Sequence, residues 1–561
     1  MIGMTLALSV IATSCSDWDD HYDMAPDSNA NATIWQNLQS NSKLSQFAAL
    51  VKKAGYDQVL NGSRTLTVWA PEDGTFNYDS INAIDDKDLL NEFVLNHIAN
   101  SNYPASGAIN EDIHMLNKKV MNFSGSDAYT MDDLMVLEPN IASKNGVIHA
   151  ISGSMQFHEN VYESISPDKY PVDSFSAYFH KYDVKQLDEA NSVPGPVVDG
   201  HLTYLDSVVN LSNTMCNLYS AYINSEDSSY TMILPTNTAW EQAIAANKNY
   251  LQYAKSVVYH DPTKANSDTK TDTTYTYNID LLQDSLSKAS VLSQIFFNNN
   301  LYGTGGNQTL KNYTGGQLNC DSIVTTARRR FYRDDANAIF QGATRLEKSN
   351  GSVWLADKLN FHPWAGMNPV IPYLAINYLI STEMTAHTYY VSKTERNPKV
   401  SGDMALYVEI SNSDGNPTVS FPLRGARSNT TYNIYVVLVP SNISDTTITN
   451  PLPNMFQASL QYNNAKGAIA RKNLGTIRDN DVTKIDTTLV GSFEFPVSYV
   501  GLDDVYPVLT LQSRVTTSNL SKYDRTLRIG GVLLVPKELD DYIESHPGYY
   551  YHYDAAVSSS Y

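Results

Sequence analysis

Residues 64–76 read RTLTVWAPEDGTF, and they contain the most informative strand pattern of the first domain. The apolar run from Leu66 to Ala70 predicts a short buried strand, and Pro71 ends it because proline cannot donate to a sheet ladder. Residues 230–240 repeat the pattern as YTMILPTNTAW. A strand pattern that recurs in this way indicates an internal repeat, and therefore two domains of one kind.

Two further segments accompany the strand. The dipeptide Asn145-Gly146 predicts a tight turn followed by a buried strand that reaches Ile151. Between the two strands, residues 88–98 show helical spacing and contain Leu95-Asn96-His97. The later segment also recurs, because Asn350-Gly351 is again followed by an apolar run.

In this order the segments resemble the fasciclin domain. That family has a Thr-x-Phe-Ala-Pro-Thr segment, then a Leu-x-x-His helix, then Asn-Gly-x-Ile-His-x-Ile-Asp; this chain departs from it at Glu72 and Ser152. The resemblance implies one such domain at residues 33–160 and a second, enlarged by an insertion, at 170–384. The matching positions are Thr67, Pro71, His97, Asn145, Gly146 and His149 in the first copy, and Pro235, Asn237, Asn350, Gly351 and Asp357 in the second.

We expect the motif residues to be structural, with proline ending a strand and glycine supplying a positive φ. His97 and His149 are expected to be buried and bonded to the main chain. The alternative is that they are ligands or acid–base groups, but no Cys, Asp or second His stands nearby at ligand spacing. Residues 261–280 are rich in Thr, Asp and Lys, and we expect an insertion or mobile loop that buries no face.

From about residue 385 the pattern changes to short β-rich segments separated by polar turns such as Asp414-Gly415. This spacing predicts a β-sandwich over 385–548, followed by a tail at 549–561. The run at 525–536 resembles the last strand of galactose-binding-like jelly rolls. The expected fold class is multidomain α+β: two fasciclin-like α/β domains followed by a galactose-binding-like (jelly-roll) β-sandwich.

The N-terminus carries an apolar run that ends in Thr13-Ser14-Cys15. It resembles a bacterial lipoprotein signal peptide, which implies removal of residues 1–14, a lipid anchor on Cys15, and an acidic flexible tether over 15–32. The residues after the cysteine resemble the signal that takes Bacteroidetes lipoproteins to the outer face of the outer membrane: Ser16, Asp17, Asp19 and Asp20. The alternatives are a plain secretory signal or an apolar segment of the fold. No Lys or Arg precedes Cys15, which departs from the usual signal peptide.

The net charge and the absence of catalytic motifs exclude several classes of function. A net charge of −20 disfavours nucleic acid, whose phosphates would be repelled. The sequence has no G-x-S-x-G elbow, H-E-x-x-H pair, Walker A loop or C-x-x-C pair, so we expect no enzyme activity, no metal and no cofactor. Cys216 and Cys320 either pair in an oxidising compartment or remain two buried thiols.

Aromatic residues are the candidate contacts. The 38 tyrosines suit binding surfaces and glycan stacking, but they also suit plain β-structure. Trp364 lies between turn residues, where it either stacks on a ligand or fills the junction between the second and third domains. The candidate ligand or partner contacts are Trp364, Tyr549, Tyr550 and Tyr551.

Together these features predict a non-catalytic lipoprotein of the outer membrane that faces the extracellular side. It would bind a glycan or dock as an accessory subunit on a SusC/SusD-type nutrient importer, because fasciclin domains resemble interaction modules and such lipoproteins often accompany these importers. The alternative is an adhesin that binds host or neighbouring-cell surface components.

Overall fold

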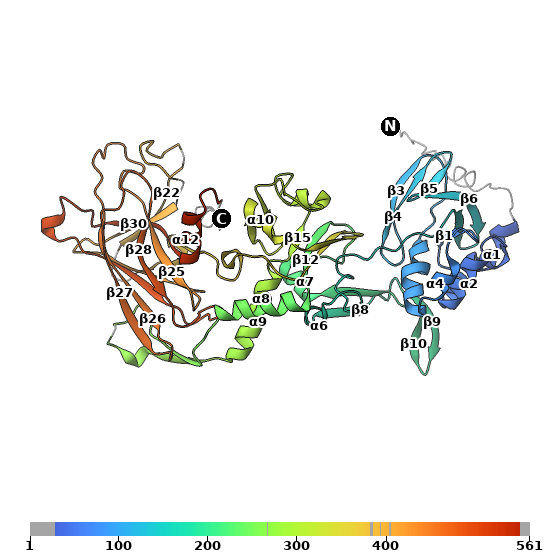
Figure 1. Cartoon of the computed structure of the whole chain (residues 1–561), viewed down its shortest axis with the longest axis horizontal. Coiled ribbons are helices and arrows are strands. Elements are labelled where there is room, and N and C mark those ends of the chain that lie inside the picture. The colour runs from blue at the N-terminus through green and yellow to red at the C-terminus, as the bar shows by residue number, and fades with distance from the viewer. Residues whose placement is uncertain (1–27, 266, 382–384, 393, 403–405, 550–561) are drawn as a thin grey trace, which may run out of the picture. The chain divides into compact units, whose positions relative to one another are not determined.

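The computed structural model describes residues 28–265, 267–381, 385–392, 394–402 and 406–549 (Figure 1). The chain divides into two compact units. Unit 1 contains the described residues up to Asn160 with Tyr182–Thr214 and Asn224–Asp227, and unit 2 contains Val161–Lys181, Met215–Ile223 and the described residues from Ser228 onward. Among the described residues, no helix has both the length and the apolar content needed to span a bilayer.

A seven-stranded sheet forms unit 1, in the order β2-β1-β7-β6-β5-β4-β3. Its two motif strands, β1 and β7, run parallel, and they pair from Leu66 with Gly146 to Pro71 with Ile151. Every residue of β1 is buried, as its apolar run predicts. The strands are β1 (Leu66–Pro71), β2 (Ile98–Asn100), β3 (Ile109–His114), β4 (Val120–Gly125), β5 (Tyr129–Met131), β6 (Leu134–Ser143) and β7 (Gly146–Ile151).

Short helices contribute most of the main core of unit 1. Thr33 begins α1 with a capping box, because its side chain accepts from the Gln36 N–H while the Gln36 side chain accepts from the Thr33 N–H. The helix expected at 88–98 is a π-helical turn followed by a 3₁₀ turn. The helical elements are η1 (Ser28–Asn31), α1 (Ile34–Ser40), α2 (Ser45–Lys53), α3 (Asp57–Leu60), α4 (Tyr78–Asn82), α5 (Asp86–Asp88), η2 (Leu89–Val94) and η3 (Leu95–His97).

Residues 182–214 form an arm that belongs to unit 1, although the sequence places them in a domain spanning 170–384. In this arm one hairpin, β9–β10, lies between two further strands, β8 and β11, that pair with each other. The arm contacts the first core through Val193 and through a hydrogen bond between Tyr56 and Asp206. These are tertiary contacts without a local sequence signal. The strands are β8 (Asp183–Leu187), β9 (Val193–Val198), β10 (His201–Asp206) and β11 (Val209–Asn213).

Unit 2 repeats the central pairing of unit 1 in a four-stranded sheet of order β15-β12-β19-β18. β12 and β19 are parallel, and they pair from Tyr230 with Gly351 to Pro235 with Ala356, the same register relative to the Asn-Gly turn as in unit 1. The strands are β12 (Tyr230–Pro235), β15 (Phe296–Asn298), β18 (Thr344–Lys348) and β19 (Gly351–Ala356). The surrounding elements are α6 (Asp173–His180), α7 (Thr214–Tyr219), α8 (Asn237–Asn249), α9 (Ile279–Leu292), η5 (Asn307–Asn312), β16 (Ser322–Val324), β17 (Arg330–Tyr332), α10 (Arg333–Ile339) and η6 (Pro363–Ala365).

The expected insertion at residues 261–280 packs two partly buried tyrosines against the core of the C-terminal sandwich, although we expected this segment to bury no face. β13 (Ser256–Tyr259) and β14 (Thr273–Thr276) form a hairpin, joined by η4 (Thr269–Thr271). Val257 is buried in the core of the C-terminal sandwich, and Tyr275 and Tyr277 pack against that core. Tyrosines between threonines supply the apolar surface that the polar composition conceals.

The C-terminal part of unit 2 is a sandwich of two sheets, coloured orange to red in Figure 1. One sheet has the order β22-β23-β30-β25-β28, with β20 also paired to β30, and the other has the order β21-β24-β29-β26-β27. One apolar core contains residues of both sheets. The first sheet contains β20 (Ile371–Leu374), β22 (Thr385–Tyr390), β23 (Leu406–Ser411), β25 (Thr431–Leu438), β28 (Asp486–Glu494) and β30 (Leu527–Pro536). The second contains β21 (Ile380–Ser381), β24 (Thr418–Pro422), β26 (Met455–Asn463), β27 (Ile469–Arg478) and β29 (Val508–Ser513), and the helices are α11 (Ala375–Tyr378), η7 (Thr517–Asn519) and α12 (Lys537–Ser545).

Candidate functional site

The Asn of each Asn-Gly pair joins separate parts of the main chain. The Asn145 side chain accepts a hydrogen bond from the Ile34 N–H at 2.8 Å and donates one to the Leu60 carbonyl at 3.0 Å. Asn350 accepts from the Val161 N–H at 2.9 Å in the same way. Because buried main-chain groups need partners, these side chains are structural.

Gly146 and Gly351 both adopt a φ of +140°. A Cβ atom would stand 1.8 Å from the Leu66 carbonyl oxygen at the first position and 1.8 Å from the Tyr230 carbonyl oxygen at the second. Only glycine fits such a close approach of two backbones.

His97 is fully buried and bonded to main chain at both ring nitrogens. Its Nδ1 lies 2.7 Å from the Phe93 carbonyl oxygen, and its Nε2 accepts from the Met155 N–H at 3.0 Å. The proton therefore belongs on Nδ1. Burial lowers the pKa of His97 to about 4, so the ring is neutral at pH 7.

His149 is bonded in the opposite sense. Its Nε2 lies 2.9 Å from the Tyr103 carbonyl oxygen, and its Nδ1 accepts from the Asn140 N–H at 3.2 Å. Burial lowers the pKa of this ring to about 4 as well. Neither motif histidine has a nitrogen left for a ligand, so the geometry fits a structural role for both.

The other motif residues also occupy framework positions. Pro71 and Pro235 are the last residues of β1 and β12. Thr67 donates to a main-chain carbonyl just after β2 at 2.8 Å, and Asn237 accepts from a main-chain N–H at the start of α6 at 2.9 Å. Asp357 is exposed directly after β19.

Trp364 is not an exposed platform for a ligand. Its side chain is 5% exposed, its ring stacks on His362 with centroids 4.4 Å apart, and its Nε1 donates to the Tyr549 hydroxyl at 2.9 Å. Its apolar cluster includes residues of β25 and β30, so the junction-filling alternative is the one that its burial fits. Tyr550 and Tyr551 lie outside the described residues.

The predicted lipidation and export residues at the N-terminus also lie outside the described residues, and their roles stay predictions: Cys15, Ser16, Asp17, Asp19 and Asp20. Cys216 and Cys320 are both buried, and no disulfide joins them. Within the described part of the chain, no group of three or more His, Cys, Asp or Glu side chains is placed to hold a metal ion.

The most exposed aromatic residues of the sandwich lie on β22, a strand that the sequence analysis did not single out. All six residues of β22 are exposed, and Tyr389 and Tyr390 are 41% and 70% exposed. Successive side chains of a strand point to opposite faces, so the two rings lie on either side of β22. We call His387, Tyr389 and Tyr390 the β22 surface.

The register of β22 fixes what surrounds these side chains. Tyr389 is paired with Tyr407 of β23, and the two rings stack with centroids 5.5 Å apart. His387 is paired with Glu409, which in turn is paired with Arg528 of β30. Directly opposed residues share one face of a sheet. The polar and charged row of His387, Glu409 and Arg528 therefore lies beside the pair of Tyr389 and Tyr407.

The charged row is held rigidly. The Nε of Arg528 lies 2.8 Å from a carboxylate oxygen of Glu409 in an ion pair, and its Nη1 donates to Asp524 at 2.6 Å. These two carboxylates hold the pKa of Arg528 above its ordinary value despite its burial. Burial also raises the pKa of the Tyr407 hydroxyl, so this group stays protonated and remains a donor.

Comparison with known proteins identifies the first part of the chain. The family model of the fasciclin domain matches residues 42–156. Residues 42–156 are a fasciclin domain. No curated protein matches the chain.

Several solved structures resemble this chain at low identity. The fasciclin domain pair of the insect cell adhesion molecule fasciclin I is 12% identical over 58% of this chain and 99% of that chain, with a TM-score of 0.19. The C-terminal CBM6 of the laminarinase LamC from Zobellia galactanivorans is 12% identical over 30% of this chain and 98% of that chain, with a TM-score of 0.17. The CBM22-2 xylan-binding domain of Xyn10C from Paenibacillus barcinonensis is 8% identical over 29% of this chain and 98% of that chain, with a TM-score of 0.19. At these values the likeness does not extend to binding residues.

Proposed function

We propose that the protein is a non-catalytic binding protein that recognises a glycan through the β22 surface. The observation that carries the proposal is the pair Tyr389 and Tyr390, exposed on the strand that ends the described order of its sheet. A folded protein gains stability by burying large rings, so an exposed ring on each face of one edge strand favours a binding role, with a ligand stacked on either ring.

The chemistry of this surface suits a sugar better than a wholly apolar ligand. A tyrosine ring offers an apolar face and a hydroxyl, which match the C–H face and the hydroxyls of a sugar ring. An edge strand also presents unpaired N–H and C=O groups along one side. His387 adds a further polar group within the same strand. A ligand that needs stacking and hydrogen bonds together fits this combination.

The cellular setting is part of the proposal and is supported by the sequence. Cys15 would carry the lipid, and the residues after it would direct the protein to the outer face of the outer membrane. A SusC/SusD-type importer is the proposed neighbour, and the captured glycan would be its substrate. A single acyl chain binds membranes only marginally, so stable anchoring requires several chains.

A glycan microarray with the full mature chain tests the binding function. The wild-type chain should bind one class of polysaccharide, and Tyr389→Ala/Tyr390→Ala should reduce that signal at least tenfold, which corresponds to about 1.4 kcal/mol. Tyr222→Ala is the matched control, because Tyr222 is 50% exposed in the same unit but is not part of β22. A wild-type signal that survives the double substitution would refute the site.

The second candidate function is adhesion to a protein, and the open edge of β22 favours it. A partner strand could pair with the unpaired main-chain groups of this edge. Such binding depends little on the tyrosine rings, so Thr388→Pro, which restrains the strand backbone, would weaken it more than Tyr389→Ala would. The reverse order of effects would exclude strand addition.

A further inference from the structure

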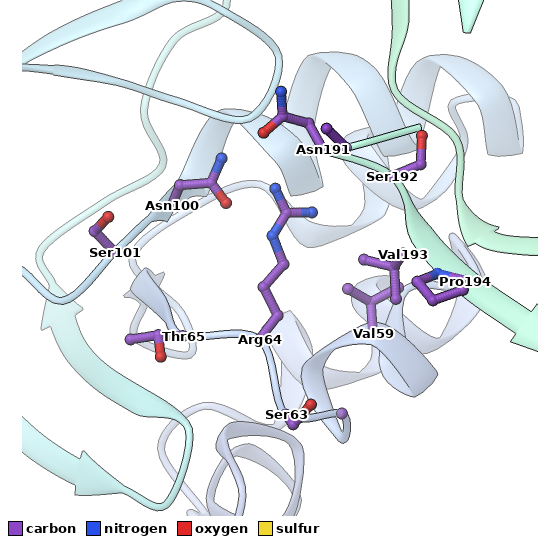
Figure 2. A pocket seen from close by; sticks show the side chains of 12 residues that line it. Val59, Ser63, Arg64, Thr65, Asn100, Ser101, Asn191, Ser192, Val193 and Pro194 are labelled. Atoms are coloured by element: carbon purple, nitrogen blue, oxygen red, sulfur yellow. The ribbon is translucent and has the colours of Figure 1, made fainter. Parts of the chain in front are cut away.

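A groove of about 510 Å³ opens in unit 1 (Figure 2). It lies between the α3–β1 connection, the end of β2 and the turn of the arm that leads into β9. Figure 2 shows the Arg64 side chain rising through its centre, with Thr65 and Ser101 on one side and Val193 and Pro194 on the other. The volume is within the range of roughly 300–1,000 Å³ that ligand sites occupy.

The guanidinium of Arg64 has N–H donors that form no hydrogen bond with the described residues. Its Nη1 is buried and lies 3.5 Å from Asp206 Oδ2 without forming a hydrogen bond. That carboxylate oxygen also accepts the Tyr56 hydroxyl at 2.8 Å, so Asp206 forms an ion pair with Arg64 on the Nη1 side alone. No hydrogen bond to the described residues uses its Nε or Nη2. These two nitrogens form one edge of the guanidinium, and that edge matches the two oxygens of a carboxylate.

The rest of the groove offers uncommitted polar groups. Four exposed side chains in its lining form no hydrogen bonds within the described part of the chain: Ser63, Thr65, Asn100 and Ser101. They supply hydroxyl and amide groups that can both donate and accept. Val59, Val193 and Pro194 form an apolar wall facing them (Figure 2). Hydroxyl-bonding groups opposite an apolar wall suit a sugar ring.

We propose that this groove binds a sugar residue that carries a carboxylate. The Nε and Nη2 of Arg64 hold the carboxylate, and Asn100 with the neighbouring hydroxyls bonds the sugar hydroxyls. Among the described residues that line the groove only Arg64 is charged, and its partner Asp206 lies outside the lining, so a single negative charge is matched better than a phosphate dianion. The site is additional to the β22 surface and does not depend on it.

Saturation-transfer NMR on the full chain tests this site, with D-glucuronate as the probe and D-glucose as the neutral match. Glucuronate should bind and glucose should bind at least tenfold more weakly. Arg64→Gln should weaken glucuronate binding at least tenfold. Asn100→Ala, at an exposed position, should weaken it severalfold without affecting the fold. Arg64→Lys keeps the charge but loses the paired donors, and it should restore only part of the affinity.

Other outcomes overturn the proposal. One is equal binding of glucose and glucuronate. A second is glucuronate binding that neither Arg64→Gln nor Asn100→Ala weakens. A third is binding of acetate, glucose 6-sulfate or a peptide C-terminus more tightly than glucuronate. The Tyr389→Ala/Tyr390→Ala chain should bind glucuronate as the wild type does. Loss of glycan binding at the β22 surface and loss of glucuronate binding in the groove can therefore be measured independently of each other.

Discussion

Acid should destabilise the fasciclin domain of unit 1 through its two buried histidines. His97 and His149 have a pKa of about 4 in the folded chain against an ordinary value of 6.5. The unfolded chain therefore binds these protons first, and stability rises with pH between the two values. The contribution is complete above about pH 6.5 and is lost as the pH falls towards 4. At pH 5 each histidine costs roughly 2 kcal/mol of unfolding free energy, or about 4 kcal/mol for the pair.

Unit 2 provides an internal comparison. Strand pairing aligns Gly146 with Gly351, which puts Trp354 at the position of His149, and it aligns β2 with β15, which puts Ile295 at the position of His97. Neither side chain titrates, so β12 and β19 should lose less protection in acid than β1 and β7 do.

Hydrogen–deuterium exchange of the full chain at pH 5.0 and pH 7.5, corrected for the intrinsic rate, measures this difference peptide by peptide. Peptides from β1 and β7 should lose protection by about 4 kcal/mol on moving to pH 5. His201→Gln is the control, because His201 is exposed on β10 and its replacement should leave the effect unchanged. Equal losses in the two sheets, or no loss in β1 and β7, would show that His97 and His149 do not cause the acid sensitivity.

Three further outcomes are expected. Gly146→Ala should lower the free energy of unfolding by more than about 3 kcal/mol in urea titration, because its Cβ would stand 1.8 Å from a carbonyl oxygen, whereas Gly74→Ala, with open space around it, should cost only about 1–2 kcal/mol. Asn145→Ala should cost roughly 1–3 kcal/mol in the same titration, since it leaves the Ile34 N–H without its acceptor. Trp364→Phe should reduce the thermal midpoint by a few degrees and leave glycan affinity unchanged, because this residue is buried; a fall in affinity would restore it as a contact.

The parts of the fold that the sequence predicted are those with a local cause. An apolar run ended by proline gives β1, and an Asn-Gly pair with a required positive φ gives the turn before β7. Both signals lie within a few residues and recur in the second copy. The pairing of β12 with β19 could therefore be expected from the pattern of residues 230–240 and 350–359.

The parts that the sequence did not predict depend on distant contacts. Trp364 stands among turn residues, yet α12 and the sandwich strands bury it. The sequence of residues 385–390 does not predict how exposed Tyr389 and Tyr390 are in the folded strand. Two adjacent tyrosines give no alternation of polar and apolar residues, and tyrosine is also common in buried strands. Arg64 adjoins the motif strand, but only the folded arm creates the groove around it.

A crystal structure of the chain with the oligosaccharide selected on the microarray is the decisive test of glycan binding by the β22 surface. We expect a sugar ring stacked against Tyr389 or Tyr390, with its hydroxyls bonded to His387 or to the open main chain of β22. A saccharide bound elsewhere on the sandwich, with both tyrosine rings still in solvent, would contradict it.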